Sequence, residues 1–300
     1  MKIDAHVHVS ADVPDAIALM DEVGVKFLNI AVAHGSGWRE RYHRPFSGLA
    51  RRDGEHFAWC TSFDLPVFPD PDYADRTIAE LDRDFTNGAV ACKVWKNIGM
   101  DLKDENGQFV QIDHPIFQPI LSHLEREERT LIAHLGEPLA CWLPLDPGNP
   151  HYGYYSQNPE WHLYGRSDYP SHTEIIAARD RILERHPQLK FVGAHLGSLE
   201  FDVSEIAARF DRHPNFMVDT SARLGDLMCQ DPGKVRSFFL EYSDRILFGT
   251  DIVMLEPFTG CWATTSKKGF LKKIRMIRLM QMRSSLMKFP WWIRFYCTTF

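Results

Sequence analysis

Eight short apolar segments alternate with amphipathic ones over the first 256 residues of the 300-residue chain, and this alternation predicts an α/β fold of the (β/α)8, or TIM, barrel type. The apolar segments are nearly continuous, as expected for parallel strands that are buried on both faces. No GxGxxG phosphate loop follows the first segment, which disfavours an open doubly wound sheet. Because neither a repeat nor a linker interrupts residues 1–256, we expect a single barrel domain.

The expected strands are rich in β-branched and aromatic residues. In chain order they are 2–9, 26–33, 56–63, 89–95, 130–135, 190–196, 215–220 and 245–251. The expected helices, whose apolar residues recur at helical intervals, are 14–23, 73–85, 116–125, 173–184, 203–210 and 233–242. In the first helix, Pro14 stands at the start, Ile17, Met20 and Val23 share one face, and Gly24 ends the pattern.

The connection after the fifth strand, residues 137–172, is too long for an ordinary loop of a barrel. Long loops of this kind are either functional or disordered, and disordered segments are poor in aromatic residues. This connection is rich in tryptophan and tyrosine. We therefore predict a lid-like loop over the active site, with packing against the surface as the alternative.

Composition and charge exclude several classes of protein. The net charge of −6 disfavours a nucleic-acid partner, which requires a basic face. The start of the chain lacks the features of a secretory signal, and no stretch reaches the roughly 18 apolar residues of a membrane span. The six cysteines are scattered without a CxxC pair, as expected for reduced, buried thiols. We expect a cytoplasmic protein with a small-molecule substrate.

The net charge hides a division of the chain at residue 256. All 40 acidic residues lie at or before Glu256, so residues 1–256 carry a net charge of −15 (25 basic, 40 acidic) and residues 257–300 carry +9. This basic tail stands where the eighth helix is expected, so that helix is predicted to be replaced or missing. Three interpretations compete: a helix that binds anionic membranes, a substitute eighth helix, or out-of-frame translation, which we favour. No membrane partner is expected unless the tail is genuine.

Histidines and an aspartate stand at the C-terminal ends of the predicted strands. His6 and His8 are two residues apart on the first strand, so their side chains point to the same side. His134 and His195 end the fifth and sixth strands in the similar strings LIAHLGEP and VGAHLGSL, and Asp251 ends the eighth. Because the C-terminal strand ends form the active face of such barrels, these side chains are predicted to bind a divalent metal.

These motifs resemble those of the amidohydrolase superfamily over residues 1–252, and in particular its amidohydrolase-related branch, which includes proteins similar to aminocarboxymuconate semialdehyde decarboxylase. The resemblance implies a divalent metal, most often zinc, with the ligands His6, His8, His134 and Asp251. It assigns His195 either to a second metal or to polarising the substrate. One ion is favoured, and two ions are the alternative.

The motif set predicts a hydrolase in which zinc-activated water attacks an amide, ester or lactone bond of a small molecule. Asp251 is expected to accept the proton of the water and to pass it to the leaving group, while His195 or the metal stabilises the oxyanion. A non-oxidative decarboxylase that uses the same metal is one alternative, and a truncated, catalytically inactive scaffold is the other. A homo-oligomer is compatible with the sequence.

Further charged residues are expected near the substrate. Lys93 lies in the fourth strand and Lys96 follows it; in binuclear members of the superfamily, a carbamylated lysine at the end of this strand bridges two metals. For Lys93 we favour a contact with the substrate or with another charge over a metal bridge. Glu137, just past His134, is expected to orient a ligand or contact the substrate. Arg223 is expected to bind an anionic substrate, and a surface salt bridge is equally compatible with both residues.

Overall fold

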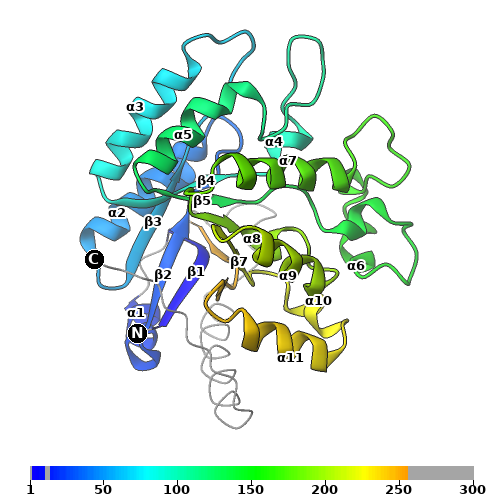
Figure 1. Cartoon of the computed structure of the whole chain (residues 1–300). Coiled ribbons are helices and arrows are strands. Elements are labelled where there is room, and N and C mark those ends of the chain that lie inside the picture. Colours follow the sequence, from blue (N-terminus) through cyan, green and yellow to red (C-terminus); the bar gives the residue numbers. More distant parts are fainter. Residues whose placement is uncertain (1, 11–13, 256–300) are drawn as a thin grey trace.

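The computed structural model describes residues 2–10 and 14–255, and the centre of this part of the chain is one sheet of nine parallel strands (Figure 1). Hydrogen bonds connect the strands in the order β8-β7-β6-β5-β4-β3-β2-β1-β9, so each strand from β1 to β8 pairs with the next one in the chain. The strands are β1 (Lys2–Val9), β2 (Val25–Ile30), β3 (Phe57–Ser62), β4 (Ala89–Val94), β5 (Thr130–Ala133), β6 (Phe191–Gly193), β7 (Phe216–Asp219), β8 (Ile246–Leu247) and β9 (Ile252–Met254).

One stretch of chain, residues 246–254, contacts both edges of the sheet. Its first part, β8, pairs with β7, and its last part, β9, pairs with β1. Between these strands the Ala5 amide donates to the Phe248 carbonyl and the Asp251 amide donates to the His6 carbonyl, both at 2.8 Å. The sheet therefore curls round on itself, which confirms the predicted barrel fold. The expected last strand is split into β8 and β9.

The two faces of the sheet bury different clusters of side chains. The inner cluster draws small and aliphatic residues from the strands and consists of Ala5, Leu28, Ile30, Cys60, Ala91, Ile132, Val192, Ala194 and Leu247. The larger, outer cluster joins strand residues such as Cys92 and Leu131 to apolar residues of the helices. Because side chains alternate along a strand, Lys93 of β4 shares the inner face with Ala91.

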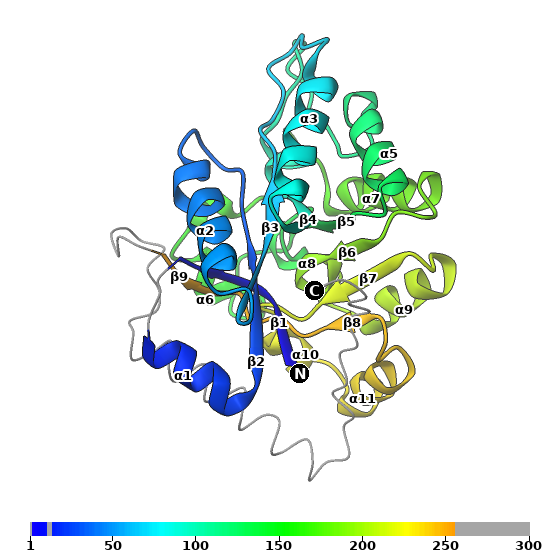
Figure 2. The ribbon, with the colours of Figure 1, turned by 90° about the vertical axis from the view of Figure 1, so that its left-hand side faces the viewer.

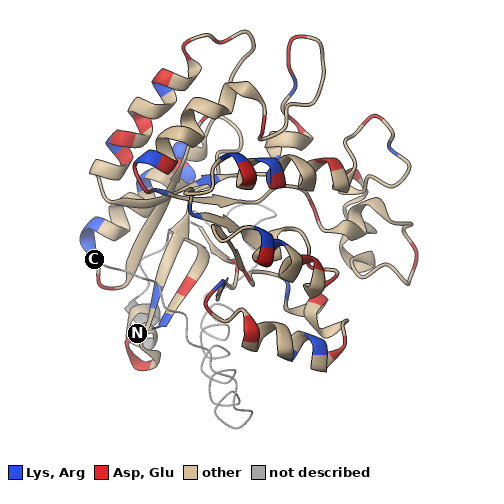
Figure 3. Cartoon of the chain, in the orientation of Figure 1, with Lys and Arg blue, Asp and Glu red and all other residues tan. Residues whose placement is uncertain are grey.

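Helices cover the outer face of the sheet, where α3 and α5 pack side by side (Figures 1 and 2). The described helices are α1 (Pro14–Val23), α2 (Arg44–Arg52), α3 (Tyr73–Thr86), α4 (Asn97–Met100), α5 (Gln118–Arg126), α6 (Tyr152–Tyr155), α7 (His172–Arg185), α8 (Ala194–Gly197), α9 (Val203–Arg212), α10 (Leu224–Met228) and α11 (Pro232–Glu241). All six predicted helices are present. The sequence did not predict α2, because only Phe46 and Leu49 mark its buried side among several arginines. Acidic and basic residues are interspersed along outer helices such as α3 and α7 (Figure 3).

Residues 137–172, which the sequence predicts to form a lid, contain three short helices: η3 (Leu139–Trp142), α6 and η4 (Pro159–Trp161). Two contacts hold this segment across the barrel. His151 Nε2 lies 2.7 Å from Asp226 Oδ1 of α10, and the Lys96 ammonium lies 4.0 Å from the centre of the Trp161 ring. The segment therefore passes over the C-terminal end of β4 and reaches α10. Opening and closing of this segment stays a prediction.

Other predictions concern the tail and the cysteines. The basic tail, 257–300, and the replaced or missing eighth helix lie outside the described residues. Among the helices of residues 2–10 and 14–255, none is both long and apolar enough to cross a membrane. Cys60, Cys92 and Cys141 are buried free thiols, as predicted. Cys229 is exposed, so the prediction of a buried thiol is wrong there, because this residue ends the short surface helix α10.

Candidate metal centre

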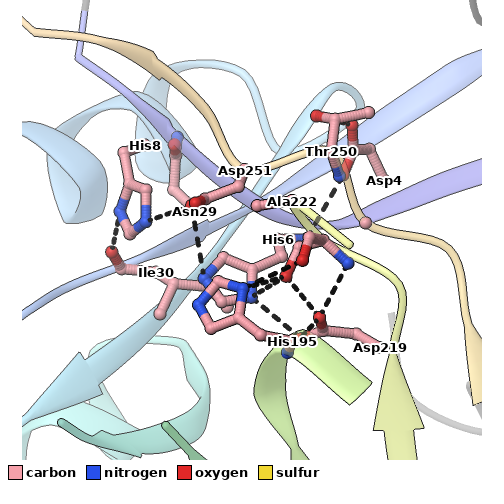
Figure 4. Close-up of polar contacts among 12 residues, drawn as sticks. Asp4, His6, His8, Asn29, Ile30, His195, Asp219, Ala222, Thr250 and Asp251 are labelled. Atoms are coloured by element: carbon pink, nitrogen blue, oxygen red, sulfur yellow. Dashed lines mark hydrogen bonds and ion pairs between the residues drawn. The ribbon is translucent and has the colours of Figure 1, made fainter. Parts of the chain in front are cut away.

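The first strand and the turn after β8 bring His6, His8 and Asp251 together (Figure 4). The two histidines are buried, and their ring centres lie 5.4 Å apart. Asp251 Oδ1 lies 3.2 Å from His8 Nε2 and 3.8 Å from His6 Nε2. Asp251 adopts a φ of +58°, a left-handed conformation that is unfavourable for residues other than glycine and that is common at functional sites. This turn separates β8 from β9 and directs the carboxylate toward β1.

His195, which follows β6, is the third histidine of the group. Its ring centre lies 4.8 Å from that of His6. His6, His195 and Asp251 each offer a ligand atom, and these atoms lie within 4.8 Å of one another. The side chain of Asp251 is 28% exposed, whereas that of His6 is 1% exposed. Solvent therefore reaches the group from the side of the Asp251 carboxylate.

Hydrogen bonds at Nδ1 fix the orientation of all three rings. His6 Nδ1 lies 2.8 Å from Asp219 Oδ2, His8 Nδ1 lies 2.7 Å from the Ile30 carbonyl, and His195 Nδ1 lies 3.0 Å from the Ser221 carbonyl. Carbonyl and carboxylate oxygens only accept, so Nδ1 of each ring carries the hydrogen atom. In a neutral ring the lone pair is then on Nε2. Metal-binding histidines are typically held in this way.

Burial favours neutral rings in this group, and the contacts of the carboxylates with the rings favour ionised carboxylates. Burial lowers the pKa of His6, and it lowers the pKa of His195 to about 3. Burial alone raises the pKa of Asp219 and Asp251, but the histidines facing each carboxylate hold its pKa well below the ordinary value. Neutral imidazoles and an ionised carboxylate form a donor set that fits a divalent cation.

His134 lies beside this group without joining it. The residue follows β5, and its ring centre is 4.3 Å from that of His195. Its buried Nε2 has no hydrogen-bond partner among the described residues, and burial lowers its pKa well below the ordinary value. A buried, neutral imidazole whose Nε2 is without a partner is suited to a metal or a substrate. The geometry thus groups His195 with His6 and Asp251, whereas the resemblance names His134 as the ligand and gives His195 to a second metal or to the substrate.

Lys93 and Arg223 supply positive charge near the histidines. Lys93 is 1% exposed, and its Nζ has no hydrogen-bond partner in the described part of the chain. Arg223 Nη1 donates to the Ala222 carbonyl at 3.0 Å, while its buried Nε has no partner in residues 2–10 and 14–255. The charge of Arg223 contributes to the lowered pKa of His134 and His195. Both cations therefore lie close enough to the site to act on a bound anion.

Glu137 lies at the mouth of the barrel, where it forms an ion pair with Lys96. The ammonium of Lys96 also lies 4.0 Å from the ring centre of Trp161 and 5.1 Å from that of Trp95. Burial lowers the pKa of Lys96 to about 8. Glu137 thus contacts a lysine beneath the predicted lid, and within the described part of the chain it forms no hydrogen bond or ion pair with the histidine group. A role of Glu137 toward the substrate stays a prediction.

Sequence reasoning missed several residues that hold the candidate ligands in place. Asp219 accepts from His6 Nδ1 and, at 2.9 Å, from the His195 amide, so one carboxylate orients two candidate ligands. Asp4 is fully buried and accepts hydrogen bonds from the Thr250 amide at 3.0 Å and from its hydroxyl at 2.6 Å, next to Asp251. Asp219 ends β7, so the strand-end rule that selected the other site residues would also have found it. Asp4 carries no such signal.

Comparisons with known proteins concern nearly the whole described chain. A solved structure of 2,6-dihydroxybenzoate decarboxylase from Rhizobium is similar with a TM-score of 0.53 and 19% identity, covering 94% of this chain and 100% of that one. A dihydroxybenzoic acid decarboxylase from Polaromonas, solved with bound manganese, is similar with a TM-score of 0.51 and 18% identity, covering 94% and 97% of the two chains. A 4-oxalomesaconate hydratase from Rhodopseudomonas palustris has a TM-score of 0.51 and 14% identity, covering 95% and 99%.

At these identities, the likeness to solved structures shows the fold alone. No match was found among curated proteins. The family is shown by a sequence model described as amidohydrolase, which matches residues 3–261 and so includes every residue of the candidate centre. On this match, the chain belongs to the amidohydrolase family.

Proposed function

We propose that this protein is a metal-dependent hydrolase of an anionic small molecule. The observation that carries the proposal is the convergence of His6 Nε2 and His8 Nε2 on the Asp251 carboxylate. The superfamily uses divalent metals, and imidazole nitrogens with a carboxylate oxygen suit zinc. We favour one zinc ion, held by these three residues together with His195 or His134.

In this proposal, Asp251 transfers the protons and Asp219 orients His6, one of the proposed metal ligands. A bound divalent ion lowers the pKa of water and polarises a carbonyl group. Asp251 remains ionised and partly exposed, so it is placed to accept a proton from the attacking water and to deliver it to the leaving group. Asp219 keeps the Nδ1 hydrogen of His6 in place, which reserves Nε2 of that ring for the metal.

The substrate class follows from two buried cationic side chains that each have a nitrogen atom without a hydrogen-bond partner in the described part of the chain. A buried cation without a partner is unfavourable, and an anion that binds beside it removes this cost. Lys93 Nζ and Arg223 Nε have no hydrogen-bond partner among the described residues. We therefore propose that the substrate carries a carboxylate, and that the bond hydrolysed is an ester, lactone or amide bond near this group.

Decarboxylation is the second candidate, and the same two cations favour it. A carboxylate held between the cations and the metal would be the group that leaves as carbon dioxide. Asp251 would accept a proton from water and pass it to the carbon atom that the carboxylate leaves. The solved decarboxylases named above share the fold, and one of them binds manganese. Zinc and manganese are therefore both to be tested.

The experiment measures metal content and the fate of water. The full chain is purified, supplied with zinc or manganese, and assayed in ¹⁸O-labelled water against carboxylated lactones, esters and hydroxybenzoates. We expect about one metal equivalent and incorporation of ¹⁸O into the product. Release of carbon dioxide with no ¹⁸O in the organic product would instead support decarboxylation. A protein without metal and without turnover would be the inactive scaffold.

A matched pair of variants controls for general destabilisation. His6→Ala removes a proposed ligand. His56→Ala removes a histidine that also pairs with carboxylates, Asp53 and Asp21, but lies before β3 at the opposite end of the barrel. We expect loss of metal only in the first variant. Equal metal content in both would contradict the proposed centre.

A further inference from the structure

His195 is carried by a turn of unusual backbone conformation. Four consecutive residues have a positive φ: His195 (58°), Leu196 (58°), Gly197 (63°) and Ser198 (56°). Three of them are not glycine, so this left-handed turn is unfavourable by itself and persists only where neighbouring groups hold it. The turn directs His195 toward His6 and Asp251, so its stability bears directly on the candidate centre.

Helix α7 holds this turn from the outside of the barrel. Arg179 Nη1 donates to the carbonyl of Gly197, and His172 Nε2 lies 2.8 Å from the carbonyl of Ser198. The two side chains are seven residues apart, which places them on the same face of the helix. They bind the carbonyl groups of two adjacent residues, at the end of the turn opposite to His195.

The contact between Arg179 and the turn leaves little free space. A Cβ atom at Gly197 would lie 3.1 Å from Arg179 Nη1 and 3.1 Å from Phe216 Cζ. The guanidinium group lies 4.9 Å from the centre of the Phe216 ring, and the side chain is 1% exposed. The arginine is thus in direct contact with both the turn and β7, the strand that ends in Asp219.

Packing alone does not explain a buried arginine at this place. Removing a guanidinium group from water is costly, and a buried ion pair adds little net stability compared with an apolar residue of similar size. Arg179 donates to Asp180 Oδ1 at 2.7 Å, and Arg209 donates to the other oxygen of the same carboxylate at 2.9 Å. What distinguishes Arg179 from Arg209 is the directional hydrogen bond to the Gly197 carbonyl.

We propose that Arg179, assisted by His172, is a positioning residue for the metal centre, because it holds the left-handed turn that presents His195. The inference rests on the proposed metal-dependent function. Arg179 acts on the backbone of the turn from outside, while Asp219 binds the His195 amide from inside. Fixing the turn from both sides keeps the ligand group assembled before any metal binds, which favours tight binding.

The test compares four variants of the full chain, and one of them, Arg179→Lys, is the conservative substitution. Arg179→Met removes the bond to Gly197, and His172→Phe removes the bond to Ser198 while keeping an aromatic ring beside Trp142 and Phe201. Arg209→Met is the matched control, because it breaks a pair with the same Asp180 without touching the turn. Zinc affinity is measured by competition with a coloured chelator, and the visible spectrum of bound Co²⁺ reports the geometry of the ligands. Melting temperatures report general destabilisation.

We expect zinc binding about tenfold weaker in Arg179→Met and His172→Phe, with an altered Co²⁺ spectrum, and wild-type binding in Arg209→Met. Arg179→Lys, which keeps one donor, is expected to recover part of the affinity. Wild-type affinity and spectrum in folded Arg179→Met and His172→Phe would overturn the positioning role and leave the proposed function standing. If Arg179→Met does not fold, His172→Phe decides by the same criteria. A wild-type protein that binds neither Zn²⁺ nor Co²⁺ would overturn the proposed function and this inference with it.

Discussion

The two sides of the candidate centre differ in how completely their polar groups are paired. On the β1 side, Nδ1 of His6 and of His8 each has an acceptor, and Asp251 faces both Nε2 atoms. On the β4–β5 side, Lys93 Nζ and His134 Nε2 are buried without a hydrogen-bond partner among the described residues. Buried polar groups in proteins are normally paired. The comparison therefore supports our proposal of a prearranged side that binds the metal, here called the metal side, and a second side, the substrate side, whose partner is the substrate.

The largest effect on turnover is expected from a substitution of Asp251, the carboxylate at the centre of the metal side. Asp251→Asn keeps the size of the side chain but removes the charge that faces His6 and His8. We expect turnover to fall by about 10²–10⁴-fold, together with weaker metal binding, as measured by the ¹⁸O assay and by metal analysis. Asp53→Asn, which alters the partner of His56 at the other end of the barrel, is the control. Unchanged turnover in Asp251→Asn would contradict the catalytic role of this carboxylate.

A smaller effect on the same side is expected from Asp219→Asn. The amide can no longer accept at both oxygens, so it fails either His6 Nδ1 or the His195 amide. We expect zinc affinity to decrease by about 10–100-fold, which chelator competition measures. Ser221→Ala is a milder variant, because the Ser221 backbone carbonyl that accepts from His195 is retained. Equal zinc affinity in Asp219→Asn and the wild type would show that the orientation of His6 does not depend on this carboxylate.

Lys93→Met tests the substrate side through stability. Burial lowers the pKa of Lys93 below its ordinary value of 10.5, so the folded protein releases this proton more readily than the unfolded chain. The stability cost of the lysine is therefore full below the folded pKa and decreases as the pH rises toward the unfolded value. We expect Lys93→Met to be more stable by about 1–3 kcal/mol at neutral pH.

Denaturant unfolding of Lys93→Met and the wild type at several pH values measures this difference. The difference is expected to shrink as the pH rises, and binding of carboxylate substrates is expected to weaken while zinc affinity stays unchanged. Arg181→Met, which removes an exposed arginine paired with Asp113 on the outer surface, serves as a control for the loss of a positive charge. A difference in stability that grew with pH would contradict the buried, unpaired ammonium.

The smallest effect is expected outside both sides, at the contact that ties the predicted lid to α10. Asp226→Asn weakens the 2.7 Å interaction with His151. We expect the free energy of unfolding to fall by about 0.5–1.5 kcal/mol without a change in zinc affinity. Denaturant unfolding and zinc titration measure the two quantities. A loss of zinc affinity in Asp226→Asn would contradict the separation of this contact from the metal side.

The sequence predicted the barrel and the residues at its strand ends better than the hydrogen bonds that orient these residues. Parallel strands of a barrel place their C-terminal ends on one face, so His6, His195 and Asp251 were expected to lie together from their positions alone. The acceptors that orient the rings, such as Asp219 and the Ile30 carbonyl, come from other strands and depend on register. No local pattern encodes such contacts.

The left-handed turn at His195 and the ion pair on the substrate side could not be predicted from the sequence either. Leu196 and Ser198 are not residues that predict a left-handed turn, since tertiary contacts with Arg179 and His172 impose it. The ion pair of Glu137 with Lys96 joins two loops, so spacing along the chain gave no sign of it. The roles of the eight predicted site residues stay predictions until they are tested by substitution.

The stretch that curls the sheet onto itself also carries the Asp251 carboxylate, which couples assembly of the centre to the synthesis and pairing of residues 246–254. His6 emerges early in synthesis, whereas Asp251 follows 245 residues later, just ahead of the strand that pairs with β1. Contacts between residues so far apart in the chain form slowly. A nascent polypeptide that stops short of Met254 has its histidines but lacks the full pairing of its first strand. Binding of the proposed metal would therefore require that β9 has paired with β1, and it would stabilise only molecules in which this pairing has formed.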